Sequence, residues 1–405
     1  MRGLRVIEAD GLLDQEVEAQ VQGVELGRAA GVGRQAGQDR VQATRIEQRP
    51  MVGERSDARA RHACERLGPG QVSAGHSHDD HVRLVPEGGQ MRPGRPARPD
   101  DAEAYPVHGS NDTSQARCGM RVCVTGANGK LGRGVVEELL AHDHEVVATD
   151  VAGAPGHLSE LAVPLAHADL TDLGQTVDIL QGVDAVVHLA NIPAPGMETP
   201  ANTFTRNVTM NFHVFHAATL LGMARVVWAS SETTLGLPFD VPPRYVPIDE
   251  AHYPLPTSTY ALSKVVSETM AQQMAAWSGI PFVALRLSNI MSVADYARFP
   301  SWQRDAHARK WNLWSYIDLR DAASACRLAL DAPISGARSY IIANADTVME
   351  RPTTELLREV FPDVPVRDDI IGTASLFSTA AARADLGWRP THGWREPSPG
   401  RLRSA

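Results

Sequence analysis

In this chain, a tyrosine and a lysine that lie four residues apart could exchange protons with a substrate. Tyr260 and Lys264 lie in the segment 258–264, and residues at this spacing share one face of a helix. The chain uses arginine for almost all of its positive charge, and its lysines are Lys130, Lys264 and Lys310. An amine is a compact charge whose pKa can be tuned, whereas a guanidinium stays charged. The pair therefore predicts a site at which the phenol group of Tyr260 acts as an acid or a base.

A glycine-rich turn upstream could hold a second reactant. The apolar run 120–125 is followed by Gly126, Gly129 and Gly132, and then by apolar residues at helical spacing. This order predicts a strand, a tight turn and an amphipathic helix. Gly126 would permit the turn, Gly129 would let the backbone approach a pyrophosphate, and Gly132 would let the helix pack on the strand. The turn predicts a dinucleotide site.

Further strands are needed to bring these two groups together. Apolar runs at 145–150, 185–190, 225–231 and 281–286 predict buried strands of a parallel sheet, and the segment 168–172 closes another. Asp150 ends the first of these runs, where a carboxylate would bind ribose hydroxyls and repel a 2′-phosphate, which favours NAD over NADP. We expect a Rossmann-like doubly wound α/β domain at about 120–397, with a small C-terminal substrate lid mainly in 288–397.

The two motifs together resemble the short-chain dehydrogenase/reductase superfamily. The match is closer to its extended branch, the NAD-dependent epimerase/dehydratase family, and it covers roughly 120–394. The segment 386–390 is similar to the closing motif of that family. The resemblance implies NAD as the cofactor, a sugar-like small molecule as the substrate, and a homodimer that pairs the helices near 207–218 and 258–277 with their symmetry mates.

The resemblance also assigns roles to individual residues. It implies that Tyr260 is the acid/base, that Lys264 lowers the pKa of Tyr260 and holds the nicotinamide ribose, and that Ser231 binds the reacting oxygen. Asn207 matches the asparagine that braces the site, whereas His188 is expected to be a core histidine. The residues that it assigns to NAD are Gly126, Asn128, Gly129, Lys130, Leu131, Gly132, Asp150, Asp169, Leu170, Ala190, Asn191, Tyr260 and Lys264.

The substrate side departs from the family pattern. Glu232 follows Ser231 where such an acid is unusual, and Leu235 replaces a tyrosine. A short segment with Arg309 and tryptophans stands where nucleotide-sugar epimerases carry a longer insertion, and Arg309 lies where uronate dehydrogenases place a carboxylate-binding arginine. Trp311 and Trp314 could equally be core residues. The candidate substrate-binding residues are Glu232, Ser288, Asn289 and Arg309.

Three functions remain open at this point. The leading hypothesis is an NAD-dependent oxidoreductase that acts on a sugar or sugar-acid hydroxyl or carbonyl. The second is a nucleotide-sugar 4-epimerase or dehydratase, in which NAD is regenerated in each turnover. The third is a dinucleotide-sensing regulator without turnover, which the presence of Ser231, Tyr260 and Lys264 disfavours.

Composition narrows the remaining possibilities. A net charge of -9 and a pI near 5.9 give no support for nucleic-acid binding, and no apolar run is long enough to span a membrane. The cysteines lack metal-ligand spacing, so no metal site is predicted. Cys123 and Cys326 fall in apolar elements and are expected to be buried thiols, which fits a reducing cytoplasm.

Residues 1–119 differ sharply from the remainder. The first 118 contain no Lys, Phe or Trp, and Tyr105 is their tyrosine. Such a segment cannot bury enough apolar area to offset chain entropy. It is expected to be a disordered tail, an arginine-rich segment that binds an acidic partner, or a stretch outside the natural protein because the start was assigned too early; Met120 begins the first predicted strand.

Overall fold

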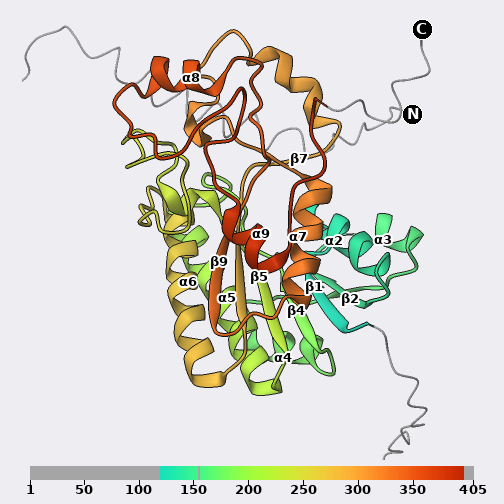
Figure 1. Ribbon diagram of the computed structural model, residues 1–405. Helices are drawn as coiled ribbons and strands as arrows, with labels where there is room; N and C mark the ends of the chain where they lie inside the picture. Colours follow the sequence, from blue (N-terminus) through green and yellow to red (C-terminus); the bar gives the residue numbers. More distant parts are fainter. Residues whose placement is uncertain (1–118, 154–155, 396–405) are drawn as a thin grey trace, which may run out of the picture. The chain divides into compact units, whose positions relative to one another are not determined.

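A parallel sheet forms the centre of the protein in the computed structural model (Figure 1). The structure describes residues 119–153 and 156–395, so the predicted N-terminal extension lies outside the described residues except for Gly119. The main sheet has seven strands in the order β3-β2-β1-β4-β5-β6-β9. These strands are β1 (Arg121–Thr125), β2 (Glu145–Asp150), β3 (Leu165–His167), β4 (Ala185–His188), β5 (Arg225–Ser231), β6 (Phe282–Leu287) and β9 (Ala337–Ile342).

Helices cover both faces of this sheet. On one face α5 packs against α4 and α6, and on the other α2 packs against α7 (Figure 1). The helices are α2 (Lys130–Leu140), α3 (His157–Glu160), α4 (Leu173–Leu180), α5 (Pro200–Leu221), α6 (Thr259–Ser278), α7 (Leu319–Asp331), α8 (Thr353–Val360) and α9 (Ala380–Leu386). The doubly wound architecture predicted from the sequence is confirmed.

Two hydrophobic cores follow from the alternation of side chains along the strands. Val122 and Val124 of β1 face the core with α2 and α7, whereas Cys123 between them faces the core with α4, α5 and α6. In a parallel sheet covered on both faces, each strand must therefore be apolar on both sides. This requirement explains why the strands read as nearly continuous apolar runs. Cys123 and Cys326 are both buried free thiols, as predicted.

The strand order creates a crevice at one edge of the sheet. The chain leaves β1 towards β2 and β3 on one side, and then returns to β4 on the other. Connections that diverge in this way leave a ligand-sized gap beyond the carboxyl ends of the two central strands. The glycine turn after β1 and the loop after β4 both open into this gap.

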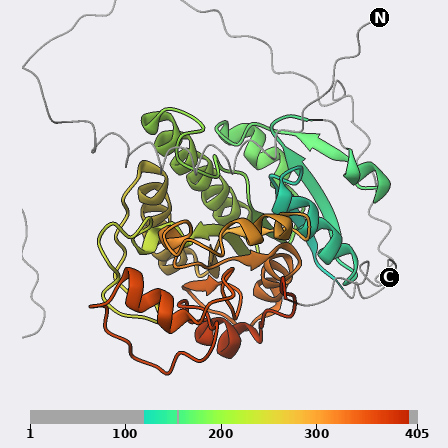
Figure 2. The ribbon, with the colours of Figure 1, turned by 90° about the horizontal axis from the view of Figure 1, so that it is seen from above.

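A third hydrophobic cluster lies in the C-terminal half of the chain. It contains Phe299, Trp302, Trp314 and Tyr316, with residues of α8, and it surrounds the short segments β7 (Ile290–Met291), β8 (Ile317–Asp318), η2 (Asp295–Ser301) and η3 (Lys310–Asn312). From above, the orange and red C-terminal segments lie grouped together (Figure 2). The predicted lid segment 288–397 thus contributes most of this cluster, to which residues between 235 and 248 also belong. The same segment also contains parts of the main domain, because β9 pairs with β6 and α7 covers the sheet. Trp314 is fully buried and is a core residue.

No helix within residues 119–153 and 156–395 combines the length and apolar character that crossing a membrane requires.

Candidate active site

A deep cavity of about 810 Å³ lies beyond the carboxyl ends of the strands. Its walls include the glycine turn after β1, the ends of β2 and β5, the loop after β4, the start of α6 and the segments after β6. The volume is towards the upper end of the range of about 300–1,000 Å³ for ligand pockets. Most of the residues singled out from the sequence line it, namely Gly126, Gly129, Lys130, Leu131, Gly132, Asp150, Asp169, Leu170, Ala190, Asn191, Ser231, Glu232, Tyr260, Lys264, Ser288, Asn289 and Arg309.

The glycine turn has the shape that a pyrophosphate site needs. Gly126 has a φ of +66°, and a Cβ there would lie 2.8 Å from the backbone nitrogen of Ala190. A Cβ on Gly132 would lie 2.1 Å from the carbonyl oxygen of Gly126, so α2 packs directly on the turn. The N-cap of α2 is Gly129, which has no side chain that could accept from the first amides of the helix. These amides therefore stay available to an anion. These observations fit a dinucleotide.

Two acids line the same cavity as the glycine turn. Asp150 accepts hydrogen bonds from the backbone nitrogens of Asn128 (3.0 Å) and Val151 (2.8 Å), which fix its carboxylate at the end of β2. Asp169 accepts hydrogen bonds from the backbone nitrogen and the hydroxyl of Thr171, and these hydrogen bonds lower the pKa of Asp169. Both acids line the cavity, whereas Asn128 contributes its backbone to the turn and is not part of the wall.

Asn207 holds the loop after β4 in place. Its Oδ1 accepts from the backbone nitrogen of Ile192 at 2.8 Å, and its Nδ2 donates to the carbonyl oxygen of Ile192 at 3.1 Å. Ala190, Asn191 and Ile192 of this loop line the cavity, but Asn207 itself does not. Asn207 thus fixes the loop without lining the cavity, and its predicted part in catalysis stays a prediction.

His188 is a core residue, as the sequence predicted. Its Nδ1 lies 2.7 Å from the hydroxyl of Thr125, and its Nε2 lies 2.9 Å from Oδ1 of Asn211. Complete burial lowers the pKa of His188 to about 3, and the charge of Lys264 contributes to the lowering. The neutral imidazole therefore ties β1 and β4 to α5, and it does not line the cavity.

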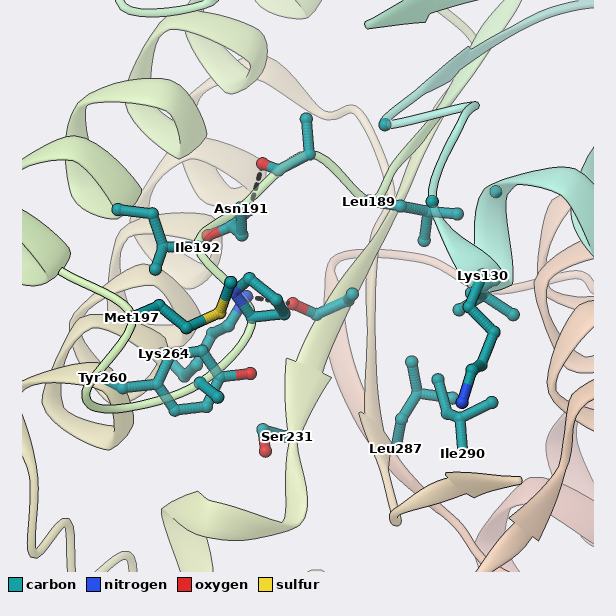
Figure 3. Close-up of a pocket in the computed structure, with 18 of the residues that line it drawn as sticks. Lys130, Leu189, Asn191, Ile192, Met197, Ser231, Tyr260, Lys264, Leu287 and Ile290 are labelled. Atoms are coloured by element: carbon teal, nitrogen blue, oxygen red, sulfur yellow. Dashed lines mark hydrogen bonds between the residues drawn. The ribbon is translucent and has the colours of Figure 1, made fainter. Parts of the chain in front are cut away.

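Tyr260, Lys264 and Ser231 face one another across the cavity (Figure 3). Tyr260 and Lys264 lie in the first turns of α6, where Ser258 caps the helix by accepting from the nitrogen of Ala261 at 3.1 Å. The spacing of four residues turns both side chains inwards, as predicted. The Lys264 Nζ lies 5.6 Å from the centre of the Tyr260 ring.

Burial sets the pKa values of Tyr260 and Lys264 in the protein without a cofactor. Burial raises the pKa of Tyr260 to about 12, although a hydrogen bond from Ser231 lowers it and the charge of Glu232 raises it. Burial also lowers the pKa of Lys264 to about 7, and its Nζ donates to the carbonyl oxygen of Ala229 at 2.8 Å. The protein by itself therefore does not bring Tyr260 towards neutral pH, because Lys264 is desolvated and partly discharged there.

Ser230, the neighbour of Ser231, belongs to a different buried group. Its hydroxyl donates to Oε1 of Glu268 at 2.6 Å, and Arg286 donates to both oxygens of Glu268 at 3.0 and 2.7 Å. Both serines line the cavity, but the Ser230 hydroxyl is engaged by Glu268, whereas Ser231 hydrogen-bonds Tyr260.

A buried acid, Glu232, and a buried cation, Arg309, lie in the part of the cavity wall that is proposed to contact the substrate. Glu232 is 3% exposed, and burial raises its pKa to about 7. Arg309 is 2% exposed and its guanidinium lies 4.5 Å from the ring centre of Trp302 and 4.6 Å from that of Trp311. It also donates to Oδ1 of Asn289 and to the carbonyl oxygen of Ser315, each at 3.4 Å. Arg309 is thus a fixed part of the wall.

Several cavity residues had not been predicted from the sequence. Arg298 lies in η2, and Met197, Glu198 and Arg206 lie at or just before α5. Glu198 accepts from Arg206 at 3.1 Å, which pairs their charges at that side of the cavity. No short motif contains these residues, and only the packing of separate segments brings them to the wall.

Comparisons with known proteins identify the family of this chain. The model of the NAD dependent epimerase/dehydratase family matches residues 122–343. A uronate dehydrogenase of Pseudomonas syringae pv. tomato is 31% identical over 174 residues, which are 42% of this chain and 59% of that relative. Cinnamoyl-CoA reductase 1 of Oryza sativa subsp. japonica is 30% identical over 271 residues, which are 60% of this chain and 77% of the relative.

A solved structure shows the same fold. It is a UDP-glucose 4-epimerase of Thermus thermophilus in complex with NAD, with a TM-score of 0.50 and 24% identity, covering 68% of this chain and 95% of that one. The resemblance predicted from the glycine turn and the Tyr260–Lys264 pair is confirmed by the family match, which contains both motifs. The chain belongs to the NAD dependent epimerase/dehydratase family of enzymes, and its cofactor is NAD.

Proposed function

We propose that this protein is an NAD-dependent oxidoreductase that acts on the hydroxyl or carbonyl group of a sugar or sugar acid. The observation that carries the proposal is the placement of Ser231, Tyr260 and Lys264 in the same cavity as the glycine turn. A proton-transfer group and a dinucleotide site that share one cavity are what hydride transfer to or from a carbon bearing oxygen requires. The similarity to uronate dehydrogenases supports a sugar-like substrate.

Each of the three residues has a separate task in this proposal. The phenolic oxygen of Tyr260 takes the proton of the substrate hydroxyl, and the Ser231 hydroxyl hydrogen-bonds the same substrate oxygen. Lys264 is held by Ala229 and keeps at least one further N–H group for the ribose of the cofactor. Bound NAD⁺ would supply the hydride acceptor and a positive charge that favours the phenolate. Bringing the pKa of Tyr260 from about 12 to neutral corresponds to roughly 7 kcal/mol of phenolate stabilisation.

A substrate screen tests the proposal. Sugars, uronates and nucleotide sugars are incubated with the protein and NAD, and NADH absorbance is followed. We expect net NADH formation with at least one sugar or uronate, and none with a Tyr260→Phe variant. The absence of NADH formation and of any sugar conversion across the panel would refute an enzyme of this class acting on sugars.

A nucleotide-sugar 4-epimerase or dehydratase is the alternative. The name of the family includes such enzymes. This alternative is favoured if an isomerised or dehydrated product forms without net NADH. The short segment around Arg309 argues against it, because Arg309 and Trp311 form the cavity wall there and Trp302 packs on the Arg309 guanidinium. A regulator that only senses the dinucleotide would bind NAD and convert no member of the panel.

We also propose that the protein is a homodimer formed through α5 and α6. Several large apolar side chains remain exposed on these two helices, namely Phe212, Leu220, Leu262 and Trp277. The family resemblance places the dimer contact on the same helix pair. Val265 and Met270 of α6 are half-buried, whereas Met274 is 1% exposed and belongs to the core of the subunit, so it is not available to a partner.

Light scattering checks the assembly. We expect twice the mass of one chain at micromolar concentration, and a shift towards the monomer in a Phe212→Asp/Leu262→Asp double variant, whereas Val241→Asp on another surface leaves the mass unchanged. A monomer mass for the unaltered protein would contradict the dimer. We further propose a cytoplasmic location, supported by the free thiols Cys123 and Cys326; fractionation of the native cells would test it.

A further inference from the structure

Glu232 is an acid that the chain places directly beside the reacting groups. It follows Ser231 at the end of β5 and begins the 3-10 turn η1 (Glu232–Leu235), where the Ser231 hydroxyl accepts from the backbone nitrogen of Thr233. The turn directs the Glu232 side chain into the cavity wall. Its charge reaches Tyr260, whose pKa it raises. Glu232 therefore lies close to the position of the substrate oxygen.

One of its two carboxyl oxygens is satisfied and the other is not. The Oε1 atom accepts from Nδ2 of Asn312 at 3.3 Å. The Ser288 side chain and the backbone of Asn289 also hydrogen-bond the Glu232 carboxylate loosely and lower its pKa, but among the described residues no group makes a hydrogen bond of good geometry to Oε2. A buried carboxyl oxygen without a donor costs free energy, and such an atom in a ligand cavity is typical of a group that pairs with the ligand.

The groups around Glu232 do not remove its need for a donor. Arg309 is the cation that lowers its pKa, but the guanidinium is held by Asn289 and Ser315 between two tryptophan rings. Tyr260 is the other titratable group that Glu232 affects, and Lys264 and Arg298 line the same cavity. The Lys264 Nζ donates to Ala229, on the side of Trp228. Because Glu232 lines the cavity, a donor on a substrate bound there is within reach of its carboxylate.

We propose that Glu232 is a specificity-determining residue whose Oε2 accepts a hydrogen bond from a hydroxyl or ammonium group on a substrate carbon next to the one that is oxidised or reduced. The inference rests on the proposed function and narrows its substrate class. Sugars with a neighbouring hydroxyl or amine are accepted, whereas analogues that lack the donor, or that carry a carboxylate there, are rejected.

The selectivity depends on pH in a defined direction. The ionised carboxylate forms the stronger, charge-assisted hydrogen bond, and protonation converts it to a weaker acceptor. Because the pKa of Glu232 is about 7, the preference for the donor is stronger at pH 8 than at pH 6.

A thermodynamic cycle tests this inference, in which one change removes a hydroxyl from the substrate and the other replaces Glu232 in the protein. If the enzyme oxidises C1 of a sugar, the substrate pairs are D-glucose with 2-deoxy-D-glucose and D-galactose with 2-deoxy-D-galactose. If another carbon is oxidised, the pair is the substrate found in the screen and its analogue that lacks the hydroxyl on the neighbouring carbon. For each pair the ratio of kcat/KM values is measured at pH 8 for the unaltered protein, Glu232→Gln and Glu232→Ala. Glu198→Gln, which changes an acid elsewhere on the cavity wall, is the matched control.

We expect the unaltered protein and Glu198→Gln to prefer the hydroxyl compound by roughly ten- to hundredfold, the effect of one hydrogen bond to a charged group. The ratio should fall towards unity in Glu232→Ala and to an intermediate value in Glu232→Gln. Equal ratios in the unaltered protein and both Glu232 variants overturn the inference while NADH formation leaves the proposed function standing. If no sugar is oxidised, calorimetric binding of the same pairs to the NAD-loaded protein replaces kcat/KM, and absent or equal binding overturns it.

Discussion

Tyr260 is the residue on which the proposed chemistry depends most directly. Replacing it with phenylalanine keeps the ring and removes the oxygen that exchanges the proton. We expect turnover to fall by roughly 10² or more, because a general acid/base is lost, while the dissociation constant for NAD changes little. Steady-state kinetics and an NAD titration on the same variant measure the two effects. Retention of turnover in Tyr260→Phe would assign the proton transfer to another group.

Glu232 links the proposed specificity to stability. Its pKa is raised from 4.5 to about 7, so the folded protein binds this proton more tightly than the unfolded chain does. The stabilisation is therefore present below about pH 4.5 and is lost as the pH rises through 7. Relative to the unaltered protein, Glu232→Gln should raise the free energy of unfolding at pH 8 by at most about 3 kcal/mol, and little at pH 5.

Denaturant unfolding of the two proteins at both pH values checks this expectation. Glu350→Gln, an exchange at an exposed position, is the control and should change neither value. Loss of stability in Glu232→Gln at pH 8 would show that the carboxylate is better satisfied than its surroundings indicate. A gain at pH 8 together with weaker substrate discrimination would show that a functional group is kept at a cost in stability.

At the scale of elements, the glycines of the turn after β1 have separable roles. A Cβ on Gly132 meets backbone atoms at 2.1 and 2.7 Å, whereas a Cβ on Gly129 meets only the carbonyl oxygen of Gly126 at 3.2 Å. We expect Gly132→Ala to lower both stability and NAD affinity, since α2 must move away from β1. Gly129→Ala should leave the melting temperature nearly unchanged but weaken NAD binding by about tenfold or more, because its methyl group occupies the approach of the pyrophosphate.

Thermal unfolding with and without NAD separates the two variants. The stabilisation that NAD gives at a fixed concentration should be reduced in Gly129→Ala, although the melting temperature without NAD is retained. Unaltered NAD affinity in Gly129→Ala would place the pyrophosphate elsewhere on the cavity wall.

At the scale of the whole molecule, the N-terminal segment is predicted to be dispensable. Residues 1–118 lack the composition of a hydrophobic core, and the first strand begins at Arg121. A protein that begins at Met120 should unfold at the same temperature as the full chain and bind NAD with the same affinity. Insolubility of the shortened protein, or a clear loss of NAD affinity, would contradict the prediction. Calorimetry and an NAD titration on both proteins make the comparison.

The sequence by itself determined the nucleotide-binding half of the protein. The strands β1, β2 and β5, the glycine turn, and the Tyr260–Lys264 face of α6 are each specified within a few residues, by apolar runs, by backbone needs of glycine or by helical spacing. His188 could be assigned to the core because it stands inside an apolar strand. Strand β9 was not predicted, because Ala337–Ile342 mixes arginine and serine with apolar residues at the border of the sheet.

Only the tertiary structure decided the substrate side. Arg298, Trp302 and Arg309 meet there from segments with no regular pattern, and their contacts depend on packing between distant parts of the chain. The electrostatics also required three dimensions, since the pKa values of Lys264 and Glu232 are shifted mainly by burial. Local spacing records which face of an element a residue occupies, but the desolvation of a charge depends on everything that surrounds it.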